Sequence, residues 1–262
     1  MIKVKDIAKA IEDFAPKELQ ESYDNTGLQV GDPEMNVSAV LLCLDVTEEI
    51  MAEARRRQCN MIVSHHPLLF SGLKQITGAD PTQRIVAEAI LHGIAIYSSH
   101  TNLDSAFEGV SYELAHMLGM SDVHPLMPSS LGNETGLGVI GSVSPTPTLE
   151  FLRKVKDTFN VPHLRYSAVS PQLVVRRVAI CGGSGASLIR NAKAAGADVL
   201  LTGDLKYHDF TSYGHALVLA DIGHYESELC TKRIFSRIIR QAFPECVVYF
   251  AQAESNPIAY IE

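Results

Sequence analysis

The chain of 262 residues has no tryptophan, and aromatic residues make up only 7% of it. Platforms that stack single-stranded nucleic acid depend on such rings, so the composition gives no sign of one. Positive charge is also scarce, because 22 Lys and Arg stand against 30 Asp and Glu for a net charge of −8. We therefore expect no extended nucleic-acid footprint, although a few local donors could still hold one phosphate group.

Cysteines are few as well: there are five, and none belongs to a Cys-x-x-Cys pair. An odd number without such a pair favours free thiols over a disulfide framework. Cys43 and Cys181 lie in apolar runs, which predicts buried thiols in a reducing compartment. The first residues contain no signal-peptide core, so we expect a cytoplasmic protein. No apolar run approaches the roughly 20 residues that cross a bilayer, so we expect no membrane partner.

The hydrophobic content of 46% and the charged content of 20% are typical of a globular protein. Short apolar runs alternate with longer amphipathic stretches, which predicts an α/β fold with a largely parallel sheet. The clearest strand candidates are Val40–Leu44, Met61–Ser64, Ile94–Ser98, Val178–Cys181, Val199–Thr202, Ala216–Ala220 and Val247–Ala251. A helix is expected from Glu226 through Ala242, with its apolar residues on one side.

Part of the sequence repeats itself. A shift of 138 positions places Val37, Val40, Cys43 and Ala54 on the identical residues Val175, Val178, Cys181 and Ala192. We interpret this as two similar α/β halves related by internal duplication, residues 1–125 and 126–262. The C-terminal segment could pack back on the first half. The join falls near Met120–Asn133, which is rich in Pro, Ser and Gly and poor in periodicity.

Histidines and carboxylates follow four of the expected strands, where ligands bind in open α/β sheets. These segments are His65-His66-Pro67, Ser99 to Asp104, Gly203 to His208, and Asp221 to Glu228. This donor set suits Zn, Mn, Fe or Ni better than Ca. Consecutive residues of an extended chain point to opposite sides, so His65 and His66 could each serve a different metal ion. The alternative is one buried and one exposed histidine without a metal.

His224 and Glu228 are four residues apart and face the same way if the first helical turn is formed. Glu226 would point elsewhere and supply negative charge at the helix start. Asp104 is either a ligand or the cap of the helix that continues through Tyr112 and Leu118. His100 could be a further ligand, and His100 or Ser64 could accept the second N–H of a metal-bound histidine.

The turn Cys181-Gly182-Gly183-Ser184-Gly185 joins a strand to a helix and resembles a phosphate-binding turn, although a tight packing turn is the alternative. Together with Lys206 it is our candidate for phosphate contacts, facing the metals across a cleft between the halves. No Gly-x-Ser-x-Gly elbow is present, which disfavours a serine nucleophile. Outside the ligands, His208 and His100 are the candidates for a general acid or base, with Glu228 as a third candidate beside a bridging water.

Several motifs resemble the family of GTP cyclohydrolase I type 2 homologues, also called the Nif-three-like family. They are Ser22 to Gly31, Ser64-His65-His66-Pro67, Thr101-Asn102-Leu103-Asp104, Gly182 to Gly185, Thr202-Gly203-Asp204 and Asp221 to Glu228. The resemblance covers nearly the whole chain. It implies a two-domain α/β fold, a dinuclear metal centre between the halves, and a ring-shaped homohexamer. The implied ligands are His65, His66, Asp104, His224 and Glu228.

Three functions remain open at this point. The first is a hydrolase in which two divalent transition-metal ions activate a water against a nucleotide-like small molecule, with C8 of the purine as the target in GTP. The second is a protein that holds or delivers the metal without turnover. The third is a hexameric scaffold whose acidic surface binds other proteins. The family name favours the first, and the metal identity is not determined by this ligand set.

Overall fold

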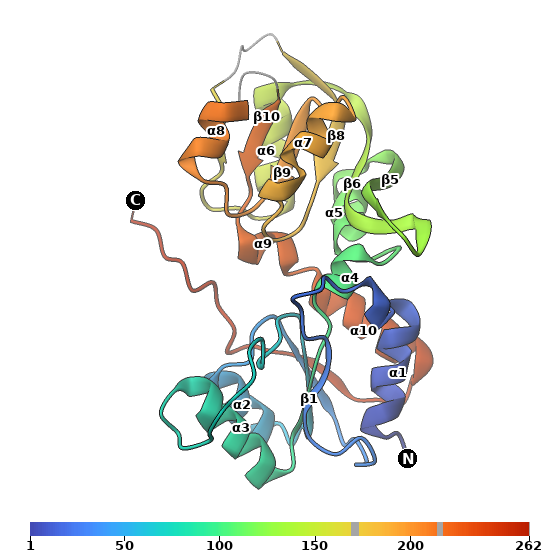
Figure 1. Cartoon of the computed structure of the whole chain (residues 1–262), viewed down its shortest axis with the longest axis vertical. Coiled ribbons are helices and arrows are strands. Elements are labelled where there is room, and N and C mark those ends of the chain that lie inside the picture. Colours follow the sequence, from blue (N-terminus) through green and yellow to red (C-terminus); the bar gives the residue numbers. More distant parts are fainter. Residues whose placement is uncertain (169–172, 214–216, 262) are drawn as a thin grey trace. The chain divides into compact units, whose positions relative to one another are not determined.

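The computed structural model describes residues 1–168, 173–213 and 217–261. Two compact units make up the chain: Met1–Leu103 with Thr231–Glu262, and Asp104–Cys230. Each unit has its own β-sheet with helices packed against it (Figure 1). The α/β class predicted from the sequence is therefore confirmed.

The sheet of the first unit has the order β1-β4-β3-β2-β11. Its strands are β1 (Gly27–Val30), β2 (Val40–Cys43), β3 (Met61–Ser64), β4 (Ala95–Ser98) and β11 (Val248–Phe250). All neighbours pair in parallel except β1, which is antiparallel to β4. Every residue of β2, β3 and β4 is buried, as expected for parallel strands covered on both faces.

Helices α2 (Glu48–Arg56) and α3 (Pro81–His92) pack together on one face of this sheet, and α1 (Val4–Phe14) and α10 (Thr231–Ala242) on the other (Figure 1). A 3-10 turn, η1 (Lys17–Leu19), follows α1. The bounds of α3 follow from local chemistry. Asp80 accepts a hydrogen bond from the Gln83 N–H at its start, and Gly93 ends it in the left-handed conformation at φ 61°.

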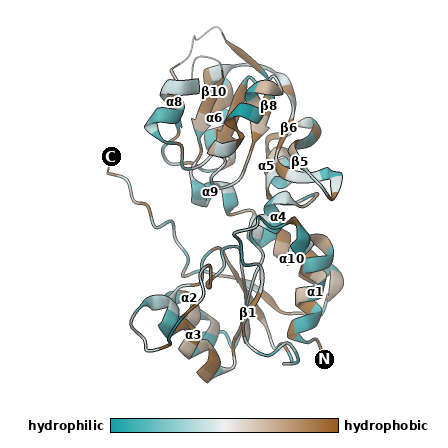
Figure 2. Ribbon diagram, viewed as in Figure 1, coloured by the Kyte–Doolittle hydropathy of each residue, from teal (hydrophilic) through white to brown (hydrophobic). Residues whose placement is uncertain are grey.

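The sheet of the second unit has the order β5-β6-β8-β9-β10-β7. Its strands are β5 (Ser121–Ser129), β6 (Gly132–Pro147), β7 (Arg165–Tyr166), β8 (Val174–Ile180), β9 (Val199–Thr202) and β10 (Val218–Asp221). Strands β8, β9 and β10 are parallel, and the others pair antiparallel. Figure 2 shows β8 and β10 in the brown of hydrophobic residues.

Helices α5 (Val110–Leu118) and α6 (Thr148–Thr158) contact each other as well as β6 and β8. Helix α7 (Ile189–Ala194), preceded by η2 (Ala186–Leu188), lies by β9, and α8 (Tyr207–Tyr213) lies by β10. Two short helices, α4 (Thr101–Ser105) and α9 (His224–Glu228), complete the elements. The chain passes from the first unit to the second within α4 and returns just after α9.

The sequence did not predict the β5–β6 hairpin: the region Met120–Asn133, which is poor in periodicity, contains strand β5 and the start of β6. The position of a join between two duplicated halves stays a prediction. Two prolines, Pro125 and Pro128, obscure the strand pattern of β5. They are tolerated because β5 is the edge strand of its sheet and loses no interior ladder bond. The predicted single helix Glu226–Ala242 is also two helices, interrupted at Leu229 and Cys230.

The compact units differ in their bounds from the expected halves 1–125 and 126–262. Helix α5 packs on the second sheet, and hydrophobic periodicity alone cannot tell which sheet covers a helix. The C-terminal residues return to the first unit, as the sequence allowed. The 138-residue shift carries β2 onto the end of β8 and β3 onto β9. A helical segment links β2 to β3, and another links β8 to β9. Duplication itself stays a prediction, and Ala216 of the predicted strand Ala216–Ala220 lies outside the described residues.

The cysteines are free thiols, and all but Cys246 are buried. Among the described residues, no helix combines the length and the hydropathy that a bilayer span requires.

Glu53 attaches the C-terminal segment to the first sheet. Its fully buried carboxylate accepts hydrogen bonds from the Gln252 N–H, the Ala253 N–H at 2.7 Å and the Arg57 Nε at 2.7 Å. Burial by itself raises the pKa of this carboxyl, but these hydrogen bonds lower it by more. The carboxylate therefore stabilises the fold at pH values above its unfolded pKa of about 4.3, and this contribution disappears as the pH falls below that value.

We predict that Glu53→Ala lowers the free energy of unfolding by about 2–3 kcal/mol at pH 7, because the hydrogen bonds from three donors to one buried carboxylate are lost. Glu48→Ala is the matched control on the same helix. Its carboxylate is exposed in a pair with Arg84, so its loss should lower the free energy of unfolding much less than the loss of Glu53. Urea unfolding measures both. Equal losses in the two variants, or an effect of Glu53→Ala that is undiminished at pH 3, would contradict this role.

Candidate functional site

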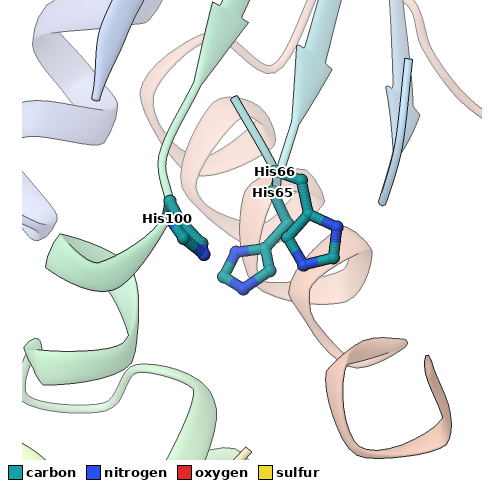
Figure 3. Close-up of side chains that lie close together, drawn as sticks. All are labelled: His65, His66 and His100. Carbon is teal, nitrogen blue, oxygen red and sulfur yellow. The ribbon is translucent and has the colours of Figure 1, made fainter. Parts of the chain in front are cut away.

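Three histidines gather at one edge of the first sheet. His65 and His66 directly follow β3, and His100 follows β4 after one residue. Because β3 and β4 are parallel neighbours, their carboxyl ends share this edge. The ring centroids lie 5.1 Å (His65–His66), 5.3 Å (His65–His100) and 5.5 Å (His66–His100) apart (Figure 3). One nitrogen from each ring lies within 4.8 Å of the others, so this histidine cluster could hold a metal ion.

The expectation that His65 and His66 point to opposite sides is wrong. Their rings lie beside each other because the chain leaves the strand geometry after Ser64. The Ser64 hydroxyl stabilises this bend by donating to the carbonyl oxygen of His66 at 2.8 Å. His65 is fully buried, whereas His66 is partly exposed. The two histidines therefore present their rings to the same region with different access to solvent.

Each ring of the histidine cluster is oriented through its Nδ1 atom. His65 Nδ1 lies 3.0 Å from the carbonyl oxygen of Ser99, which can only accept, so Nδ1 carries the proton. His66 Nδ1 lies 2.8 Å from Asp45 and His100 Nδ1 lies 2.8 Å from Asp24. A neutral ring with its proton on Nδ1 carries its lone pair on Nε2. This is the arrangement in which histidines bind metals.

Asp24 is the most constrained of these acceptors. Its side chain is fully buried, and besides His100 it accepts hydrogen bonds from the N–H of Thr101 at 3.0 Å and from the hydroxyl of Thr101. Burial raises the pKa of this carboxyl, but the hydrogen bonds from His100 and Thr101 outweigh it and hold the pKa well below its usual range. Asp24 is therefore charged at neutral pH and keeps the proton of His100 on Nδ1.

Sequence reasoning proposed Ser64 or His100 as the partners of metal-bound histidines and missed Asp24, Asp45 and the Ser99 carbonyl. Asp45 follows β2 after one residue, so the rule of looking beyond strand ends could have found it. Asp24 lies in the motif Ser22 to Gly31, 76 positions before His100, so no local spacing pointed to this pair. A backbone carbonyl such as that of Ser99 leaves no signal in the residue types.

In the second unit, His224 and Glu228 form a second potential ligand group. Helix α9 begins at His224, so the two side chains lie on the same side, with Nε2 3.0 Å from the Glu228 carboxylate. His224 Nδ1 lies 2.8 Å from Asp204. Glu226 turns back over Gly223, as the spacing predicted.

The carboxylates of Glu228 and Asp204 change the titration of His224. The hydrogen bond to Glu228 is the main cause that raises the pKa of His224 to about 9. In the protein without metal, the ring is thus protonated at neutral pH and donates from both nitrogens. A metal ion that binds between His224 and Glu228 would replace the proton on Nε2, which couples metal affinity to pH.

Asp104 belongs to the same unit as His224 and Glu228. It lies within α4, and the helix through Tyr112 and Leu118 is instead capped at Gly109, so Asp104 does not cap that helix. Both Asp104 and Glu228 act on the thiol of Cys181. Burial first, and then these two negative charges, raise the pKa of that thiol well above its usual range. Cys181 is therefore a protonated core residue next to an acidic site.

The Gly182–Gly185 turn packs against helix α9. A Cβ on Gly183, whose φ is +59°, would lie 2.1 Å from a carboxylate oxygen of Glu228. The N–H of Gly183 donates to Ser227 Oγ at 2.9 Å, and that of Gly185 donates to Thr202 Oγ1 at 2.8 Å. These two donors are thus engaged within the protein. Ser184 and Lys206 are exposed, and a phosphate contact at this turn stays a prediction.

His208 lies on α8 with its side chain exposed and its ring beside that of Tyr207, at 5.4 Å between centroids. The other acid–base candidate, His100, lies in the histidine cluster and has a buried carboxylate behind it. The geometry of the first unit therefore favours His100.

A family model described as Duf34/NIF3 (NGG1p interacting factor 3) matches residues 2–257. The "GTP cyclohydrolase 1 type 2 homolog" of Clostridium perfringens is 35% identical over 263 residues, 99% of this chain and 100% of that protein. The protein of the same name from Lactococcus lactis is 35% identical over 261 residues, 98% of each. The crystal structure of a hypothetical protein from Staphylococcus aureus matches with a TM-score of 0.89 at 28% identity, covering 99% of both chains.

The contact between Gly183 and Glu228 predicts that Gly183→Ala destabilises the protein beyond the cost of a positive φ. Gly196→Ala is the matched control, because Gly196 has φ +74° and nothing within 4 Å of its added Cβ. Both variants should lose about 1 kcal/mol to backbone strain. Gly183→Ala should lose about 1–3 kcal/mol more, because the Glu228 carboxylate must move. Denaturant unfolding of both measures the difference, and equal losses would rule out the contact.

Proposed function

The chain belongs to the Duf34/NIF3 family, as its motifs indicated, and from this premise we propose that it binds two divalent transition-metal ions. The ligands in this proposal are His65, His66, Asp104, His224 and Glu228.

The observation that carries the proposal is shared by four histidines. In His65, His66, His100 and His224, the Nδ1 atom lies 2.8–3.0 Å from a fixed acceptor. Three of these acceptors are aspartates, which increase the basicity of the ring as well as orienting it. A histidine that only fills space in a core needs one hydrogen-bond partner. It does not need neighbouring histidines whose Nδ1 atoms also contact fixed acceptors. Repetition of this pattern favours metal binding.

The donor atoms also restrict the metal. Imidazole nitrogens with a few carboxylate oxygens suit Zn, Mn, Fe or Ni, while Ca prefers oxygen ligands alone. His and Glu side chains that could hold such ions are present in the described structure. In this proposal, availability decides which of these ions the site takes.

We further propose that the protein is a hydrolase acting on a nucleotide-like small molecule, as the name of its relatives suggests. When bound, two such ions act as Lewis acids and make water nucleophilic at neutral pH. In this proposal the Asp24-backed His100 would move a proton at its Nε2 atom, and the carboxylates of Glu228 and Asp104 would help to hold the ions. The Gly182–Gly185 turn and Lys206 are the proposed phosphate contacts. The homohexamer implied by the family resemblance and the cytoplasmic location also belong to this proposal.

The metal content tests the first part. We expect close to two transition-metal ions per chain by elemental analysis, and the double variant His65→Ala, His66→Ala should lose most of them. Glu228→Ala should lose at least one ion, because this carboxylate contacts His224 directly. Glu226→Ala is the matched control two residues away and should keep both. Wild-type protein that takes up no metal after incubation with Zn, Mn, Fe or Ni would refute the proposal.

Turnover tests the second part. The protein loaded with each metal is incubated with GTP and related nucleotides, and products are identified by mass spectrometry. We expect a metal-dependent product whose rate of formation falls roughly 100-fold or more in Glu228→Ala and by a smaller factor in Lys206→Ala. Tight metal binding without any product across the panel would contradict hydrolysis. That result would favour the alternative, a protein that holds or delivers metal.

A further inference from the structure

Two exposed aromatic side chains lie together at the rim of the histidine cluster. Tyr23 is 62% exposed and Phe70 is 50% exposed, although large aromatic residues are usually buried. Their ring centroids are 6.3 Å apart and the rings are tilted by 52°. They lie 47 positions apart in the sequence, so the fold brings them together.

The loop that carries Phe70 is fixed to the segment that follows Tyr23. The Asn25 amide donates to the carbonyl oxygen of Leu69 at 2.6 Å, and the N–H of Leu69 donates to the Gln29 side chain at 3.1 Å. Gln29 in turn donates to the carbonyl oxygen of Asn25 at 2.7 Å. Leu69 also packs against the core of the first unit. The position of Phe70 is therefore set before any ligand arrives, which reduces the entropy cost of binding.

The Tyr23–Phe70 pair adjoins the histidines directly. Phe70 meets the His100 ring edge-on, with centroids 6.4 Å apart and an angle of 77° between the planes. Tyr23 immediately precedes Asp24, the carboxylate that orients His100. A flat ring stacked on Phe70 would consequently lie near the His100 ring.

We propose that the Tyr23–Phe70 pair is the platform on which a planar heteroaromatic ring of the substrate stacks. This inference rests on the proposed function, since it positions the ring at the metal ligands. The size of the pair favours a small molecule over a protein partner. A fully buried aromatic side chain covers about 150–250 Å², so two half-exposed rings provide much less than the roughly 800 Å² that each partner contributes to a stable protein interface.

The test is calorimetric titration of the zinc-loaded protein with guanosine and nicotinamide as heteroaromatic probes, and with ribose 5-phosphate as the non-aromatic comparison. We expect the two heteroaromatic probes to bind and Phe70→Leu to weaken them roughly tenfold, the contribution of one stacking contact. Phe70→Trp should restore binding because it keeps an aromatic face. Tyr23→Leu should also weaken binding, whereas affinity for ribose 5-phosphate should not change in any variant.

Leu91→Ala is the control for loss of an exposed apolar side chain. Leu91 is 81% exposed at the end of α3, which leads to the amino end of β4 and thus to the opposite edge of the sheet from the histidines. The Leu91→Ala variant should bind the probes like the wild type. Wild-type affinity in Phe70→Leu, or no binding of either heteroaromatic probe to the wild type, would overturn the proposal. A change in the mass of the assembly in Phe70→Leu would also overturn it, because the pair would then join copies of the chain.

Metal analysis of the same samples separates this inference from the proposed function. If the wild type and Phe70→Leu hold equal amounts of zinc but neither binds the probes, the platform is refuted and the metal site stands. If the wild type takes up no zinc, the proposed function fails by itself. The probes are therefore also titrated into the metal-free protein, in which Phe70→Leu should again weaken binding.

Discussion

The candidate site depends on one repeated interaction, the hydrogen bond from a histidine Nδ1–H to an acceptor that the fold holds in place. Asp45 comes from the end of β2, Ser99 from the end of β4, and Asp24 from the segment before β1. Each acceptor selects the tautomer with the lone pair on Nε2 and also sets the direction of the ring. The sheet order matters for the site because it brings these segments to a common edge.

The C-terminal segment supports this edge from behind. Glu254 is nearly buried and accepts hydrogen bonds from the N–H of Leu44 and from Lys232 Nζ, both at 2.6 Å. Leu44 directly precedes Asp45, the partner of His66. Together with the contacts of Glu53, this attaches the last strand and the residues after it to the end of β2. A residue more than two hundred positions away thus helps to hold the partner of His66 in place.

In the second unit, close backbone approach adds to the hydrogen bond between His224 and Asp204 in fixing the candidate residues. A Cβ on Gly183 would overlap the Glu228 carboxylate, and a Cβ on Gly203 would lie 2.8 Å from the backbone nitrogen of His224. The glycines therefore let two loops pack directly on the helix that carries His224 and Glu228. The turn that resembles a phosphate-binding turn in the sequence supports this helix in the structure.

The sequence by itself determined the α/β class, most strands and the residues that could bind metal. Buried parallel strands consist of continuous apolar runs, and the polar residues after them are easy to identify. It also determined that His224 and Glu228 share a face, because a spacing of four is a local property of a helix. The sequence did not predict the β5–β6 hairpin, because its prolines are compatible only with an edge strand and strand order is not a local property.

Only the tertiary structure decided which groups orient the histidines and that Tyr23 meets Phe70. Asp24 lies 76 positions from His100, and Asp45 lies 21 positions from His66. The bend after Ser64, which places the rings of His65 and His66 side by side, also depends on contacts in the folded chain. Residue type and spacing indicate which groups a side chain can bind and which face of a helix or strand it occupies. The partner that it meets is decided when strands distant in sequence pair, since pairing is selected by the burial of both faces of the sheet together.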